Sequence, residues 1–366
     1  MAQVGGQPHR PSLDVIRDDV RAMRAYAVPD ATGLIKLDAM ENPFSLPADL
    51  ARELGERLSE VALNRYPPAD PAHFKRRLAE SAGLTPGKAL MLGNGSDELI
   101  HLMIQACARR DAPGGAVVLA PTPTFVMYEV FARLDGCRFV GVSLRADFRL
   151  DLGAMLWAIE ANRPVLVFIA YPNNPTGNLF ARDEVEAILD QAPGLVVIDE
   201  AYLPFAQDTW MHQLSERPNL VVLRTLSKLG LAGLRLGYAC ADPQWIVEFD
   251  KLRPPYNVGV LPLAAADFLL DHFAVLQQQA SVIRSERARL VHALRGQAGV
   301  TAFDSAANFI LLRVPDADRL FSRLCARGIL VKNVSGSHPL LAGCLRVTVG
   351  TPQENDVFLQ ALGALL

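Results

Sequence analysis

Residues 164–202 read PVLVFIAYPNNPTGNLFARDEVEAILDQAPGLVVIDEAY, and the predicted fold depends on the pattern in this stretch. An apolar run, Pro164–Ala170, is followed by turn-forming residues, a helix-like stretch at Asp183–Gln191 and a second apolar run at Leu195–Ile198. Short β-branched runs that alternate with helical stretches are typical of a sheet covered by helices on both faces. The stretch therefore predicts an α/β fold.

The same alternation extends from about residue 90 to residue 252. It predicts seven strands: Ala89–Leu92, Val117–Ala120, Arg138–Ser143, Pro164–Ala170, Leu195–Ile198, Leu220–Arg224 and Leu236–Cys240. Helices are predicted between or after them, among them Ser96–Arg109 and Pro243–Leu252. We therefore expect a large domain with a mostly parallel, seven-stranded sheet.

The pattern changes after Pro254 and Pro255, because consecutive prolines interrupt regular structure. A compact α+β unit is predicted beyond them, with a long helix at Phe273–Leu294, strands at Phe309–Val314 and Leu345–Val349, and helices at Asp318–Arg327 and Gln353–Leu365. A chain of 366 residues exceeds what one hydrophobic core usually serves. We expect an N-terminal arm at residues 1–44, a large domain at 45–255 and a small C-terminal domain at 256–366.

The composition argues against several classes of protein. The 36 basic and 39 acidic residues are interspersed, so no basic stripe is available for nucleic acid. The N-terminus has no apolar run of signal-peptide length and no stretch is long enough to span a membrane, so we expect a cytoplasmic protein. Five scattered cysteines without a CxxC pair are expected to be reduced, and the spacing of the seven histidines predicts no metal site.

Residues 225–235, TLSKLGLAGLR, place Lys228 in a loop of small residues after a predicted strand. A single lysine in a loop is usually a surface residue. A lysine that forms a Schiff base with a cofactor needs company: a site for the cofactor's phosphate, a carboxylate for its ring nitrogen and donors to its phenolic oxygen.

Three other segments at the ends of predicted strands supply candidates for these groups. Asp199 ends an apolar strand, where α/β sheets place residues that contact ligands. Residues 171–177, YPNNPTG, follow another strand and on their own indicate a turn. Residues 93–98, GNGSDE, join a predicted strand to a predicted helix. They can be interpreted as a helix start capped by Ser96, or as a loop whose N–H groups bind a phosphate. The two interpretations are compatible, because the same unsatisfied N–H groups serve both.

In order and spacing these four segments resemble the fold-type I pyridoxal-phosphate-dependent aminotransferases, and in detail the histidinol-phosphate aminotransferases. Further matching segments are NRYP at 64–67, PTFVMY at 123–128 and CLRVTVGT at 344–351. The resemblance extends from about Tyr26 to Thr351. It implies a pyridoxal 5′-phosphate cofactor and an enzyme of histidine biosynthesis that moves an amino group between L-glutamate and imidazole-acetol phosphate, giving L-histidinol phosphate and 2-oxoglutarate.

The resemblance also implies a role for each matching residue near the cofactor ring. Lys228 is similar to the lysine that binds the cofactor aldehyde and later moves a proton. Asp199 is similar to the carboxylate that pairs with the pyridine nitrogen, which makes the ring an electron sink. Asn174 and Tyr202 resemble donors to the phenolic oxygen. Phe125 corresponds to an aromatic residue, often tyrosine in relatives, that stacks on the ring.

The cofactor phosphate is expected to bind Ser96, Asp97, Ser227 and Arg235 through main-chain amides, a hydroxyl and a guanidinium group. In many relatives the arginine lies eight positions after the lysine, whereas Arg235 lies seven after Lys228, so the loop has lost one residue. Tyr66 resembles a tyrosine that reaches the phosphate of the neighbouring subunit. The resemblance therefore implies a homodimer with shared active sites.

Substrate anions are expected to bind Arg346, with Lys332, Tyr26 and Asn308 assisting. Lys332 stands where many relatives have an arginine, and a lysine keeps the charge but loses the bidentate geometry. Two alternatives are another reaction on the same scaffold, an aromatic-amino-acid aminotransferase or a threonine-phosphate decarboxylase. A third is a cofactor-sensing regulatory domain without catalysis, which would need a DNA-binding module, and none precedes Tyr26.

Overall fold

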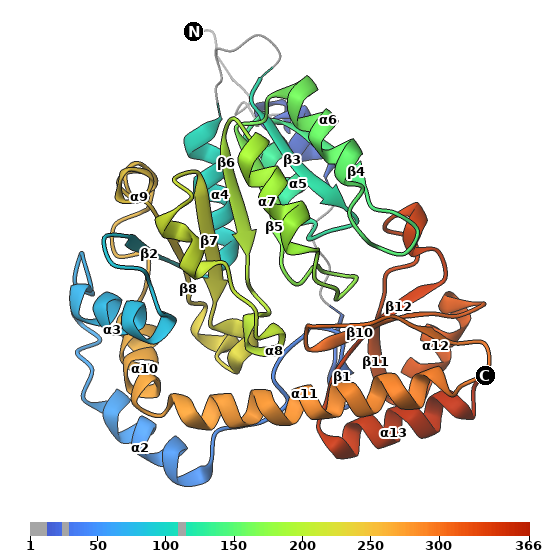
Figure 1. The fold of residues 1–366 in the computed structure, drawn as a ribbon. Coiled ribbons are helices and arrows are strands. Elements are labelled where there is room, and N and C mark those ends of the chain that lie inside the picture. Colours follow the sequence, from blue (N-terminus) through green and yellow to red (C-terminus); the bar gives the residue numbers. More distant parts are fainter. Residues whose placement is uncertain (1–12, 24–28, 109–114) are drawn as a thin grey trace, which may run out of the picture. The chain divides into compact units, whose positions relative to one another are not determined.

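The computed structural model describes residues 13–23, 29–108 and 115–366 (Figure 1). The chain divides into two compact units, residues 1–32 and Gly33–Leu366. The described part of the first unit holds a 3-10 helix, Leu13–Val15, and the short helix α1, Asp18–Ala22. Tyr26, one of the predicted substrate residues, lies outside the described residues.

The second unit contains the predicted seven-stranded sheet, in the order β2-β8-β7-β6-β5-β3-β4. Its strands are β2 (Ala89–Gly93), β3 (Val117–Thr122), β4 (Arg138–Ser143), β5 (Leu166–Ala170), β6 (Leu195–Asp199), β7 (Leu220–Thr225) and β8 (Gly237–Ala241). Only β8 runs against its neighbours, and the other pairs are parallel. The predicted fold class is confirmed.

Helices cover both faces of this sheet, because its central strands are buried runs of apolar residues whose side chains point alternately to either face. One face packs against α4 (Ser96–Cys107), α5 (Met127–Leu134) and α9 (Pro243–Asp250). The other packs against α3 (Ala72–Ala82), α6 (Leu152–Asn162) and α7 (Arg182–Gln191). Figure 1 shows the strands between these two layers.

A second sheet of five strands has the order β1-β11-β12-β10-β9. Its strands are β1 (Ile35–Leu37), β9 (Thr301–Ala302), β10 (Phe309–Arg313), β11 (Ile329–Asn333) and β12 (Cys344–Thr348), with helices α12 (Ala317–Ala326) and α13 (Pro352–Gly363). The strands β1, β9 and β11 are additions to the predicted elements. Strands β1 and β11 pair with each other in parallel, so residues 35–37 join the sheet that is otherwise built from the C-terminal part of the chain.

The helix α11 (Phe273–Arg295) contacts α8 (Leu203–Ala206) and the 3-10 helix Ser227–Leu229, which adjoin the large sheet, and also β9, β10 and α13 (Figure 1). The remaining helices are α2 (Ala48–Ser59) and α10 (Val260–Asp271). Within the described ranges no single helix is long and apolar enough to cross a membrane. The helices α10 and α11 would be long and apolar enough only if taken together, and they are bent by 80° relative to each other. The predicted domain boundary near residue 255 stays a prediction.

Candidate active site

Four loops singled out from the sequence lie at one edge of the seven-stranded sheet. The strands β2, β5, β6 and β7 run in the same direction, so their carboxyl ends meet there. These ends carry Gly93–Ser96, Asn174, Asp199 and Lys228. Because β8 runs in the opposite direction, its first residue is at the same edge and brings Arg235 with it. Topology alone therefore gathers the predicted cofactor residues.

Asp199, at the end of β6, is 5% exposed and holds two hydrogen bonds. The hydroxyl of Tyr128 donates to Oδ2 over 2.7 Å, and the main-chain N–H of Ala201 donates to Oδ1 over 3.0 Å. Burial raises the pKa of the Asp199 carboxyl to about 6, against the lowering effect of these two bonds, and the negative charges of Asp97 and Glu200 add to the rise. The carboxylate is thus fixed in orientation and titrates near neutral pH.

Lys228 is half-buried in the 3-10 helix that follows β7. Its Nζ donates to the main-chain oxygen of Ala39 over 3.3 Å and lies 5.9 Å from the centre of the Tyr202 ring. Burial lowers the pKa of the Lys228 amine to about 8, and the positive charge of Arg346 lowers it further, while Glu41 opposes the shift. An amine with such a pKa is partly neutral at physiological pH and can act as a nucleophile or a base.

The N-terminus of α4 meets Arg235 and forms a candidate anion site. Gly95, at φ 86°, is the N-cap of α4, so the interpretation of Ser96 as the capping residue is wrong and Ser96 is the first helical residue. A Cβ on Gly95 would lie 2.9 Å from an NH2 nitrogen of Arg235, and a Cβ on Gly237 would lie 2.7 Å from the Ser96 nitrogen. The two glycines keep the guanidinium close to the first N–H groups of a twelve-residue helix, which favour an anion.

Two more of the predicted phosphate residues are placed near Arg235 and the end of β7. A carboxylate oxygen of Asp97 lies 3.8 Å from Arg235, and burial raises the pKa of the Asp97 carboxyl against the influence of Arg235 and Lys228. Ser227 is buried, with its Oγ accepting a hydrogen bond from the Thr225 hydroxyl over 2.9 Å. The position of Ser227 is thereby set by the end of β7.

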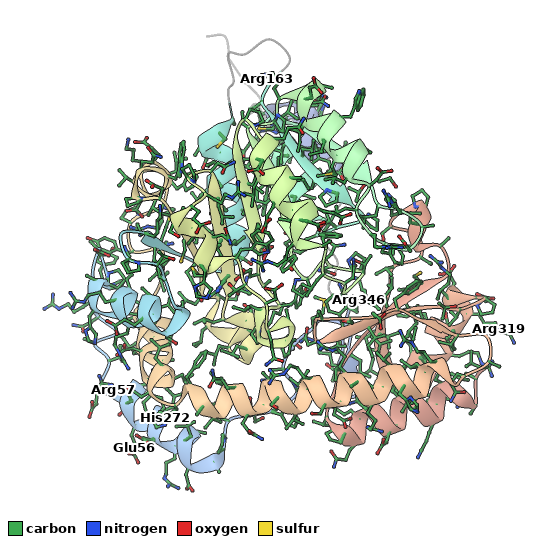
Figure 2. All side chains as sticks on the ribbon, viewed as in Figure 1. Glu56, Arg57, Arg163, His272, Arg319 and Arg346 are labelled. Atoms are coloured by element: carbon green, nitrogen blue, oxygen red, sulfur yellow. The ribbon has the colours of Figure 1, made fainter. Side chains whose placement is uncertain are left out.

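Arg346 connects the two sheets at this edge. It lies on β12, is 8% exposed and is labelled in Figure 2. One terminal nitrogen donates to Oδ1 of Asn174 over 2.6 Å, and the other donates to the main-chain oxygen of Asp38 over 2.8 Å. Lys332 is the register partner of Arg346 on the neighbouring strand β11, so both side chains belong to the same face of the second sheet.

The segment of residues 38–42 lines the site and is an addition to the predicted site residues. Asn308 is fully buried and donates from Nδ2 to the main-chain oxygen of Met40 over 3.0 Å. Asn42 donates to the main-chain oxygen of Leu229 over 3.2 Å, beside the lysine. In the sequence this segment reads DAMEN, and its final asparagine before Pro43 indicates a turn. No pattern there points to Lys228.

Three predicted residues lie at the margin of this arrangement. Tyr202 is buried, and its hydroxyl lies 3.5 Å from the Met40 sulfur. Phe125 is half-buried and meets the Tyr128 ring edge to face at 5.6 Å. Tyr66 is 81% exposed and stacks on Tyr256, with 4.8 Å between ring centres. A role for Tyr66 across a subunit interface stays a prediction.

The donor set fits a pyridine aldehyde that carries a phosphate. A buried carboxylate can pair with a protonated ring nitrogen, an amine of lowered pKa can bind the aldehyde, and the glycine-lined end of α4 can hold the phosphate beside Arg235. These requirements differ from one another chemically, and one edge of the sheet meets them all.

Comparison with known proteins shows similarity over nearly the whole chain. The model of a family described as aminotransferase class I and II matches residues 32–362. The chain is 57% identical to histidinol-phosphate aminotransferase 1 of Ralstonia nicotianae, with 98% of each chain covered, and 56% identical to histidinol-phosphate aminotransferase 2 of Cupriavidus pinatubonensis, with 96% of each covered.

Solved structures show the same fold at lower identity. The histidinol-phosphate aminotransferase from Sinorhizobium meliloti, in complex with pyridoxal-5′-phosphate, superimposes with a TM-score of 0.84 at 24% identity, covering 97% of this chain and 98% of that one. The L-threonine-O-3-phosphate decarboxylase from Porphyromonas gingivalis has a TM-score of 0.77, also at 24% identity, covering 90% of this chain and 99% of that one. The fold alone therefore does not separate these two activities.

Proposed function

Because the chain belongs to the class I and II aminotransferase family, in the group of the histidinol-phosphate aminotransferases, we propose that it is a histidinol-phosphate aminotransferase of histidine biosynthesis. It transfers an amino group between L-glutamate and imidazole-acetol phosphate, giving L-histidinol phosphate and 2-oxoglutarate, with pyridoxal 5′-phosphate as cofactor. The observation that carries this function is the identity of more than half of all residues over almost the full length of both chains.

Bound pyridoxal phosphate supplies an aldehyde that takes up the amino group and a ring that withdraws electrons from the reacting carbon. Lys228 would hold the aldehyde in the resting enzyme. Its Nζ, once released, would move the proton at the carbon that bears the substrate's amino group. The lowered pKa of the Lys228 amine suits this role, since the amine can take up and release a proton near neutral pH.

Asp199 keeps the ring nitrogen protonated, because a buried carboxylate favours a positive charge beside it. Tyr202 has a pKa raised by burial, so its hydroxyl stays protonated and can donate to the phenolic oxygen. Asn174 is held by Arg346, which takes the amide oxygen as its acceptor and so leaves Nδ2 as the group that faces the cofactor. Phe125 covers the ring.

The phosphate binds between Ser96, Asp97, Ser227 and Arg235, where the N-terminus of α4 and the guanidinium both favour negative charge. The substrate anions bind on the second sheet. Arg346 takes a carboxylate or phosphate oxygen, Lys332 adds a second positive charge from the adjacent strand, and Asn308 orients residues 38–42.

The active enzyme is a homodimer in this proposal, with Tyr66 acting at the phosphate of the neighbouring subunit. Support comes from the surface position of Tyr66, which leaves its hydroxyl accessible to a second chain. The proposal places the enzyme in the cytoplasm, and it is supported by the buried thiols of Cys137, Cys240 and Cys344, which suit a reducing compartment.

The experiment that tests the function compares amino donors in the first half-reaction. The cofactor-loaded enzyme is mixed with L-histidinol phosphate, L-glutamate, L-phenylalanine or L-threonine O-3-phosphate, and loss of the absorbance of the lysine-bound cofactor is followed. We expect the highest kcat/KM for histidinol phosphate, with glutamate as the second substrate. A higher kcat/KM for phenylalanine, or release of carbon dioxide from threonine phosphate, would favour one of the alternatives.

A further inference from the structure

We propose that Tyr128 is a positioning residue for this reaction, and that its hydroxyl holds the Asp199 carboxylate ionised and oriented toward the ring nitrogen of the cofactor. The inference rests on the proposed function, because it takes from it the role of Asp199. Tyr128 belongs to the matching segment of residues 123–128, but the sequence offers no sign of its partner, which lies 71 positions further along the chain.

The Tyr128 hydroxyl is placed by packing. Tyr128 is 0% exposed and lies on α5, on the face of the sheet that also contains Phe168. Its ring stacks on Phe168, with 4.6 Å between centres and 12° between planes, and Phe125 meets it edge on. Because the ring is packed on two sides, the position of its hydroxyl is fixed. The hydrogen bond from this hydroxyl therefore orients the Asp199 carboxylate.

The direction of the hydrogen bond is also determined. Burial and the neighbouring Asp199 raise the pKa of the Tyr128 hydroxyl well above its ordinary value, so the hydroxyl keeps its proton and donates to Oδ2. The Ala201 N–H occupies Oδ1. Each oxygen of an ionised carboxylate has two lone pairs, so one on each remains for a further donor such as a protonated ring nitrogen. A protonated carboxyl would lose the negative charge that favours a protonated ring nitrogen, and one of its oxygens would become a donor.

Besides Tyr128, only the Ala201 N–H among the groups that shift the pKa of Asp199 favours its ionisation. Desolvation and the negative charges of Asp97 on α4 and the adjacent Glu200 oppose it, and Tyr202, at the N-cap of α8, is a neutral phenol at ordinary pH. With a pKa of about 6, roughly nine in ten Asp199 side chains are ionised at pH 7. Loss of a hydrogen bond that is donated to a carboxylate raises the pKa of that carboxyl by about one to two units. Without Tyr128, half of the carboxylates or fewer would be ionised.

The first test uses the apoprotein, because no cofactor chemistry then enters the readout. Aspartate labelled with ¹³C at the side-chain carboxyl is titrated by NMR, and Asp199→Asn identifies the signal. Tyr128→Phe should raise the pKa of Asp199 by about one to two units. The matched control is Tyr171→Phe, which also removes a buried hydroxyl that donates to a carboxylate, Asp208, over 2.7 Å, and should leave the Asp199 titration unchanged.

A second substitution tests the opposite direction and does not depend on how well Tyr128→Phe folds. Ring-fluorinated tyrosine at position 128 is a more acidic donor of similar size, so it should strengthen the bond and lower the pKa of Asp199. A titration of Asp199 that moves with neither change overturns the proposal.

The pH profile of the loaded enzyme separates this proposal from the function itself. With a higher pKa, Asp199 ionises only at higher pH. The acidic limb of the pH profile of kcat should therefore move to higher pH in Tyr128→Phe. The loss of kcat should be greatest below pH 7 and should diminish as the pH rises. A purely structural defect would lower kcat equally at all pH values and contradict the proposal. If the wild-type enzyme fails to transaminate histidinol phosphate, the proposed function fails, and the titration of the apoprotein still decides the role of Tyr128.

Discussion

Asp199 and Lys228 have pKa values that burial moves toward each other. Desolvation disfavours charge, so the same environment raises the pKa of the acid to about 6 and lowers that of the amine to about 8. Lys228 can therefore change its protonation state near neutral pH, as a general base requires, whereas Asp199 is mostly ionised at pH 7, as the partner of a protonated ring nitrogen requires. Arg346 contributes by adding a positive charge close to the amine.

The lowered pKa of Lys228 predicts how fast the apoprotein captures its cofactor. Only the neutral amine attacks an aldehyde, so the rate should rise with pH through a midpoint near 8 and level off above it. Arg346→Gln should move this midpoint to higher pH, because it removes a positive charge that disfavours the protonated amine. Stopped-flow absorbance on mixing apoprotein with pyridoxal phosphate measures both. A midpoint at the ordinary lysine value of 10.5 would show that burial has no such effect.

At the scale of elements, a buried ion pair joins β6, which ends in Asp199, and β7, which is followed by the 3-10 helix that carries Lys228. Glu200 follows Asp199 and points to the opposite face, where its carboxylate meets the Arg224 guanidinium of β7 at 2.8 Å. The Glu200 carboxylate also accepts the Trp210 N–H, and Arg224 donates to the main-chain oxygen of Ala82. With both charges saturated by partners, the pair fixes the relative position of β6 and β7 at the catalytic edge.

The start of β8 and the N-terminus of α4 approach so closely that only glycine fits between them. In Gly237→Ala the added Cβ would meet main-chain atoms of Gly95 and Ser96 at 2.7 Å, so one of the two elements must move. We expect cofactor affinity to fall at least about tenfold and the free energy of unfolding to fall by about 1–3 kcal/mol. Fluorescence titration and urea unfolding measure the two effects.

The matched control is Gly233→Ala in the same loop, where a Cβ would have nothing within 4 Å. It should change the free energy of unfolding by about 0.5 kcal/mol or less. Unaltered cofactor affinity in Gly237→Ala would show that this close approach does not shape the phosphate site.

The elements that could be predicted from the sequence are those whose local residue pattern is enough to determine their secondary structure. The strands of the large sheet are buried apolar runs such as Leu166–Ala170, and such runs are visible without knowledge of their partners. The strand β1 has three residues with the polar Lys36 in the middle, β11 ends in the polar Lys332 and Asn333, and the two strands pair across almost 300 residues. Their pairing is a property of the tertiary structure, and a local pattern could not predict it.

The candidate site divides in the same way. Lys228, Asp199 and Asn174 were predictable because each follows a recognisable strand in a segment that matches a family. The bond from Tyr128 to Asp199 and the contact of Ala39 with Lys228 depend on packing between distant segments, and Tyr128 and Ala39 are common residue types without a motif of their own. Hydrogen-bond partners of this kind can be identified only once the fold is known.

At the scale of the whole molecule, the site depends on segments from both sheets and from the start of the second unit. The main-chain oxygen of Asp38, the Arg346 guanidinium and the Asn174 amide form one hydrogen-bonded chain across residues that are 308 and 172 positions apart. In the proposed function, a change in how the second sheet packs would therefore alter the position of Asn174 at the cofactor. Substrate binding on β12 and orientation of the cofactor would then be coupled through this chain.

The shared-site dimer predicts recovery of activity when two defective variants are mixed. Lys228→Ala and a Tyr66 variant with severely impaired activity are unfolded and refolded together, so about half of the dimers are mixed. If Tyr66 acts across the interface, one site of each mixed dimer has both native residues and the other has both defects, so activity should recover to about a quarter of wild type. Each variant refolded alone is the control, and stable mixed dimers without recovery would place Tyr66 in its own subunit's site.

The central claim, that this chain is an aminotransferase that binds pyridoxal phosphate through Lys228, is tested most directly by locating the covalent bond. The loaded enzyme is reduced with borohydride, which makes the link between cofactor and lysine permanent, and the modified peptide is identified by mass spectrometry. The account predicts a single phosphopyridoxyl group, on Lys228 in the peptide that contains TLSKLGLAGLR, and its absence from Lys228→Ala. A modification on another lysine, or none in protein that has bound the cofactor, would contradict it.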